Sequence, residues 1–135
     1  MFVQLLYLAK SHFRRLLTES NRRARAFCER FEEARASEAR GLQLLRQWLS
    51  PEQIAQYDAD GYFDVTGCDS GKRYRIRHGT SMNVYEIDQA GFPRTGWCFV
   101  PNASLVAGDV MLAQKIALET DERAALAVAK GFALK

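Results

Sequence analysis

The sequence predicts an α+β fold with a long N-terminal helix, a small antiparallel β-meander of about four strands, and a C-terminal helix packed on the sheet. Three observations lead to this prediction. Residues 2–36 contain no glycine or proline, residues 61–100 hold six of the nine glycines and several alternating apolar segments, and residues 109–130 return to helical spacing. We therefore divide the chain into a helical extension, residues 1–49, and a small α+β domain, residues 50–135.

The composition limits the classes of function that fit this chain. It has 135 residues and a formal net charge of +3, and no apolar run approaches the roughly 20 residues that a membrane span needs. Three cysteines, together with an N-terminus that lacks a charged start and a small-residue cleavage site, indicate a cytoplasmic protein with free thiols. No catalytic or cofactor signature is present, so we expect neither enzymatic activity nor a cofactor.

Residues 2–36 are predicted to form one long amphipathic helix. Apolar residues recur there in alternating steps of three and four, which is the spacing of a heptad pattern. A helix with so narrow an apolar stripe is expected to pack along another helix, in a homo-oligomer or with a partner protein. The alternative is a helix that folds back on its own domain. The residues expected to contact a partner helix are Val3, Leu6, Phe13, Leu17, Phe27 and Phe31.

The other side of this helix is strongly basic. From Lys10 to Arg25 there are six basic residues and one acidic residue. One interpretation is a stripe that binds a polyanion, because attraction to phosphates supplies the sequence-independent part of nucleic-acid affinity. The other is a solvated face that pairs with Glu29, Glu32 and Glu33 one turn away. The arginines expected to point away from the seam are Arg14, Arg15, Arg22 and Arg25.

Residues 37–49 are predicted to form a second helix or a bent continuation of the first. Apolar side chains recur there at helical spacing, but Gly41 weakens a helix by about 1 kcal/mol relative to alanine. We therefore expect a break in the helix near residues 37–41.

A short helix is expected to follow at residue 50. Ser50 is suited to cap its first turn, Pro51 fits the first helical position, and Gln53 completes a capping box. Gly61 fits the left-handed conformation in which helices commonly end.

Four strands are predicted after this helix. Two of them alternate apolar and polar residues, as half-buried strands do, and residues 67–71 between them are rich in the Gly, Asp and Ser that turns require. The third alternates irregularly, which indicates a bulge. Short connections favour an antiparallel meander. The predicted strands are 62–66, 72–77, 82–88 and 97–100.

The second predicted strand carries three arginines on one face. Arg73, Arg75 and Arg77 point outward, while Tyr74 and Ile76 point toward the core. Basic strands with aromatic neighbours bind single-stranded nucleic acid in small sheets. The alternative is an exposed face on which opposite charges pair across strands, with the candidate partners Asp64, Glu86 and Asp88.

The C-terminal segment returns to helical patterning. Asp109 is expected to cap a helix that covers residues 110–119. Residues 120–122 either continue this helix or cap a new one that runs to Lys130, and Gly131 ends it.

Several segments between Leu45 and Lys130 resemble a known family. They read WLSPEQ, GYFDV-GCDSGKRYRIRHG, NV-EID--G, GWCFVP and GDVMLAQKIALET. The family consists of small alphaproteobacterial proteins of the bradyrhizobia type, with looser relatives in bacteriophages. The resemblance covers about two-thirds of the chain and leaves out the basic helix before Arg40. It implies no known activity, no cofactor and no catalytic residue.

Cys68, His78 and Cys98 are the residues that a metal site or a nucleophile–base pair would use. Structural zinc sites usually have paired ligands two to four residues apart, and no such pair occurs here. No motif supplies the oxyanion site that nucleophilic catalysis needs. Residues 67–72 lack the glycine spacing of a phosphate-binding loop. We therefore predict free thiols and no metal site.

Overall fold

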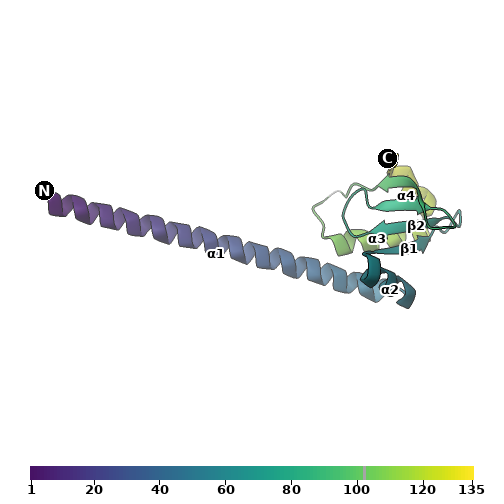
Figure 1. The fold of residues 1–135 in the computed structure, drawn as a ribbon, viewed down its shortest axis with the longest axis horizontal. Coiled ribbons are helices and arrows are strands. Elements are labelled where there is room, and N and C mark those ends of the chain that lie inside the picture. The colour runs from purple at the N-terminus through teal and green to yellow at the C-terminus, as the bar shows by residue number, and fades with distance from the viewer. Residues whose placement is uncertain (102) are drawn as a thin grey trace. The chain divides into compact units, whose positions relative to one another are not determined.

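The computed structural model describes every residue of the chain except Asn102. The chain divides into two compact units, Met1–Ala36 and Ser37–Lys135. The first unit is the N-terminal part of helix α1 (Phe2–Trp48), and the second contains the last turns of α1 and all later elements (Figure 1). These are, in order, α2 (Pro51–Asp60), β1 (Tyr62–Thr66), β2 (Arg73–Arg77), β3 (Val84–Ile87), β4 (Pro93–Cys98), α3 (Ala107–Thr120), α4 (Glu122–Val128) and β5 (Lys130–Phe132).

The strands form one antiparallel sheet in the order β1-β2-β3-β4-β5, which confirms the predicted α+β class and meander. The predicted irregularity of the third strand is also present, as a register shift between Glu86 and Ile87. The fifth strand was not predicted. It pairs with β4, and the ring of Phe132 occupies the space over Gly96, where the Cβ of any larger residue would overlap the ring. The fourth strand begins at Pro93, earlier than the sequence indicated.

One apolar core holds the second unit together. The inward face of the sheet packs against α3, and the last turns of α1 close the same core. Its most fully buried apolar side chains are Leu45, Phe63, Tyr74, Ile76, Val84, Met111 and Leu118. Leu45 and Leu49, near the end of α1, belong to this core, and the compact unit that contains it begins at Ser37.

The predicted break near residues 37–41 does not occur, since α1 continues without interruption to Trp48. Gly41 does not bend the helix, and instead lets α1 and α3 pack closely together. The backbone of α3 approaches so closely that a Cβ at Gly108 would overlap the carbonyl group of Gly41. A glycine at each position permits this contact, which offsets the weak helix propensity of Gly41.

The capping box at the start of α2 is confirmed. The backbone N–H of Gln53 donates to Ser50 Oγ at 3.2 Å, and the N–H of Ser50 donates to Gln53 Oε1 at 3.0 Å. Gly61 ends the helix with a φ of +72°, as expected from the sequence. The predicted cap at Asp109 is wrong, because α3 already begins at Ala107, where its first turn meets α1.

The two C-terminal helices are separated at Asp121. Its side chain accepts a hydrogen bond from the N–H of Ala124 at 3.3 Å, so the recapping alternative is the one that forms. Helix α4 ends at Val128, before the predicted Lys130, because the next residues are used for β5.

Candidate interaction surfaces

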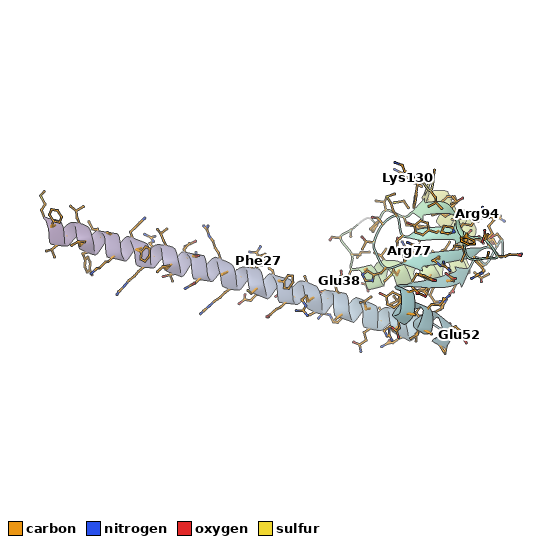
Figure 2. The ribbon with its side chains drawn as sticks, in the orientation of Figure 1. Phe27, Glu38, Glu52, Arg77, Arg94 and Lys130 are labelled. Atoms are coloured by element: carbon orange, nitrogen blue, oxygen red, sulfur yellow. The ribbon has the colours of Figure 1, made fainter. Side chains whose placement is uncertain are left out.

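The unit Met1–Ala36 presents a line of exposed apolar side chains. The six residues predicted to contact a partner helix are between 49% and 80% exposed. Figure 2 shows Phe27, one of them, standing on the surface of α1. A line of exposed apolar side chains of this kind is typical of an interaction site. We call the set Val3, Leu6, Phe13, Leu17, Phe27 and Phe31 the seam.

The four arginines predicted to point away from the seam are exposed. At about 100° per residue, Arg15 and Arg22 fall on the half of the helix opposite to the seam, Arg25 lies at its side, and Arg14 flanks the seam. Arg22 donates to Glu19 Oε1 at 3.0 Å, in an exposed pair that adds little stability. In the part of the chain that the structure describes, Arg14, Arg15 and Arg25 form no salt bridge. The predicted pairing with Glu29, Glu32 and Glu33 is not among the salt bridges of this part of α1.

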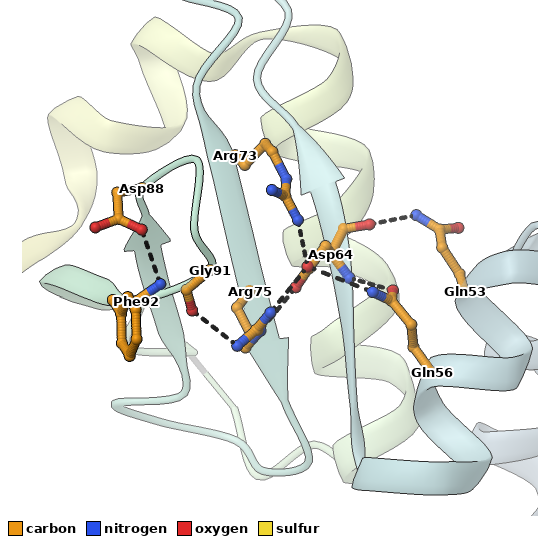
Figure 3. Close-up of polar contacts among 8 residues, drawn as sticks. All are labelled: Gln53, Gln56, Asp64, Arg73, Arg75, Asp88, Gly91 and Phe92. Atoms are coloured by element: carbon orange, nitrogen blue, oxygen red, sulfur yellow. Dashed lines mark hydrogen bonds and ion pairs between the residues drawn. The ribbon is translucent and has the colours of Figure 1, made fainter.

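The three arginines of β2 have different surroundings. Arg75 is held by Asp64, with Nε–Oδ1 and Nη2–Oδ2 distances of 2.9 and 3.1 Å, and its Nη1 donates to the Gly91 carbonyl at 3.2 Å (Figure 3). Its guanidinium also lies 4.0 Å from the centre of the Tyr62 ring. The hydrogen bond to Asp64 raises the pKa of Arg75. Only 14% of its side chain is exposed, so little of it is free to meet a polyanion.

Asp64 is the centre of this cluster. Arg73 donates to its Oδ2 at 3.0 Å, and the side-chain amide of Gln56 donates to the same oxygen at 3.4 Å. The backbone N–H of Asp64 in turn donates to Gln56 Oε1 at 3.0 Å. Gln53 donates to the carbonyl oxygen of Asp64 at 2.8 Å, which ties α2 to β1 (Figure 3). Asp64 therefore forms the cross-strand charge pairs with β2 that were one of the two interpretations of the sequence.

The remaining charges of the sheet follow the same pattern, with one exception. Lys72 pairs with Glu86 at 3.0 Å, and Arg94 pairs with Asp88 at 2.6 Å. Arg77 stacks 5.1 Å from the Tyr85 ring centre and has no carboxylate partner within the described residues. Of the seven arginines predicted to bind a polyanion, those without a carboxylate partner thus lie mostly on the N-terminal helix.

Two of the three residues considered for a metal or nucleophile site, Cys68 and His78, form separate hydrogen bonds, and Cys98 is a half-buried free thiol. Cys68 Sγ accepts from the N–H of Glu122 at 3.4 Å, and His78 Nδ1 lies 2.7 Å from the Tyr57 hydroxyl. Apart from Asn102, which is not described, no three His, Cys, Asp or Glu side chains lie close enough to hold a metal ion.

Comparison with known proteins found no match: no family model, curated protein or solved structure matches the chain. The resemblance of residues 45–130 to the alphaproteobacterial family therefore stays a prediction. Within the described residues, no helix combines the length and the apolar character that a membrane crossing requires.

One apolar cavity was not anticipated from the sequence. It has a volume of about 240 Å³ and lies in the unit Ser37–Lys135. Gln114 is the polar side chain among its described lining residues, and it already exchanges two hydrogen bonds of 2.9 Å with Asn83 instead of being free to orient a ligand. No spacing rule signals this cavity, because its walls come from a loop and a helix face. The lining residues are Phe99, Val100, Pro101, Leu105, Val110, Ala113, Gln114 and Ala117.

Proposed function

We propose that this chain is a non-enzymatic interaction or assembly protein, which self-associates or binds a partner protein through residues 2–36. The observation that carries this proposal is the exposed seam on α1. Burying apolar surface stabilises a complex by about 25 cal/mol per Å² removed from water. Helices in proteins gain most of their stability from the packing of their apolar face, so a partner bound to the seam would also stabilise the helix itself.

In this proposal the unit Ser37–Lys135 is the folded module that the helix brings into an assembly. It has its own core and depends on no residue of the seam for that core. The charge pairs around Asp64 stabilise its sheet and leave little free charge on β2.

Sedimentation equilibrium tests the proposal. We expect the full chain to show a mass above that of the monomer, rising with concentration, while a chain that starts at Ser37 stays monomeric. If the full chain is monomeric at high concentration, a partner protein is required. Equal monomeric masses combined with an unfolded N-terminal helix would remove both forms of the proposal.

A second candidate function is nucleic-acid binding, which Arg14, Arg15 and Arg25 favour because they are exposed and, within the described residues, form no salt bridge. Arg22, Arg73, Arg75 and Arg77 complete the set predicted for it. Each phosphate that a variant no longer neutralises would lower the slope of log affinity against log salt by about 0.7–0.9. We expect binding of a mixed oligonucleotide at low salt to weaken when Arg14, Arg15 and Arg25 become glutamine. Undetectable binding of the unaltered chain at low salt removes this candidate.

A further inference from the structure

We propose that the occupant of the seam is the same helix of a second copy, aligned antiparallel so that residues 3–34 of the two copies overlap. This inference rests on the proposed self-association and gives it a geometry. In heptad terms, the alternating steps place five residues at the a position and five at the d position. They are Val3, Lys10, Leu17, Ala24 and Phe31 at a, and Leu6, Phe13, Ser20, Phe27 and Ala34 at d.

Antiparallel alignment pairs each a residue with a d residue of the other copy. Three of the layers then combine a larger side chain with a smaller one, which is how packed layers fill space without cavities. The aliphatic stem of Lys10 lies against an aromatic ring, where a cation is attracted to the ring face. The layers are Val3 with Ala34, Leu6 with Phe31, Lys10 with Phe27, Phe13 with Ala24, and Leu17 with Ser20.

A parallel in-register pair of helices would pack less well at the same a and d positions. Every residue would meet its own copy, so two Lys10 ammonium groups would share one layer of the interface. Ser20 and Ala24 would form two successive layers of small side chains, which leaves a gap between Leu17 and Phe27. Antiparallel pairing removes both defects.

The charges that flank the seam lead to the same orientation. The e and g positions hold four arginines, Arg14, Arg23, Arg30 and Arg35, and no acidic residue. In a parallel pair, g of one heptad meets e of the next, which places Arg30 against Arg35 of the second copy. In the antiparallel pair, e meets e and g meets g. Arg14, Arg23 and Arg30 then face, respectively, Asn21, Leu16 and Ala9.

Disulfide mapping in the full chain tests this orientation. Cys28 is an exposed free thiol at an e position, and antiparallel alignment places Tyr7 of the second copy beside it. In the variant Tyr7→Cys, mild oxidation is expected to give a covalent dimer in which position 7 is linked to Cys28 of the other copy. Mass spectrometry of the linked peptides identifies the pair. The unaltered chain is the control, because its two Cys28 residues would lie roughly 30 Å apart along the axis at 1.5 Å per residue.

A second variant gives the opposite readout. Leu6→Cys places a thiol at a d position, which would join position 6 to position 6 in a parallel dimer but not in an antiparallel one. A dimeric mass with 6-to-6 links and no 7-to-28 links would overturn the antiparallel orientation while leaving self-association intact. A monomeric mass at every concentration, with no intermolecular links, would instead overturn self-association itself.

Discussion

Replacing Glu122 by glutamine is expected to lower the free energy of unfolding of the unit Ser37–Lys135 by about 2–3 kcal/mol at neutral pH, because charged hydrogen bonds are worth about that much. This carboxylate is buried and joins α4 to the turn between β1 and β2. It accepts from the N–H groups of Asp69 and Ser70 at 2.8 Å, from the Tyr74 hydroxyl at 2.6 Å, and from Ser70 Oγ. Chemical denaturation of both proteins measures the difference. The exposed Glu52→Gln removes the same charge and is expected to change stability by less than about 0.5 kcal/mol.

The same carboxylate makes the stability of the unit depend on acid. Burial raises the pKa of Glu122, but hydrogen bonds from Ser70, Tyr74 and the N–H groups of Ser70 and Asp69 outweigh this and lower the pKa from 4.5 to about 2. A depressed pKa contributes stability above the unfolded value and loses it as pH falls from about 4.5 to about 2. The stability gap between the unaltered protein and Glu122→Gln should therefore close over that range. A gap that stays constant from pH 7 to pH 2 would contradict this role.

Replacing Phe13 by glutamate is expected to weaken self-association of the full chain at least a hundredfold. Each buried phenylalanine contributes about 1.5–3 kcal/mol, and every dimer loses two of them. Each variant helix also brings a carboxylate into the apolar seam, where burial disfavours the charged form. With about 1.4 kcal/mol for each factor of ten, the loss of two rings alone gives a hundredfold or more. Sedimentation equilibrium over a range of concentrations measures the dissociation constant.

Leu8→Glu is the matched control for this substitution. Leu8 is 62% exposed on the same helix, close to the exposure of Phe13 at 63%, but it lies outside the seam. We expect its dissociation constant to stay within about threefold of that of the unaltered chain, since a surface change away from packed contacts has little effect. Equal loss of association in both variants would place the contact elsewhere on the helix.

The elements that depend on local pattern were predictable from the sequence. The alternation of residues 73–77 gave the correct inward and outward faces of β2, and Ser50 with Gln53 gave the start of α2. Each of these two signals is contained in a segment of only a few residues. The length of α1 was underestimated because Gly41 looks like a break until its contact with Gly108, far along the chain, is known.

The features that sequence reasoning missed depend on contacts between distant segments. Strand β5 is three residues long and is held by Phe132 lying over Gly96. Glu122 binds a turn about fifty residues earlier, which no spacing rule predicts. For the candidate surfaces, the heptad steps predict the seam, and its contact with a partner helix stays a prediction. For β2, the sequence alone could not decide whether its arginines bind a polyanion or pair with carboxylates of neighbouring strands. That decision required knowing that Asp64 of β1 lies directly opposite Arg75.

Amide hydrogen exchange of residues 5–36, measured at several chain concentrations, tests the central claim most directly. If the seam needs a second helix, protection of these amides should rise together with the associated fraction, while protection within Ser37–Lys135 stays unchanged. The unaltered helix should lose its protection when diluted to the monomer. Protection of residues 5–36 that is equally strong at every concentration, in a chain of monomeric mass, would contradict the claim.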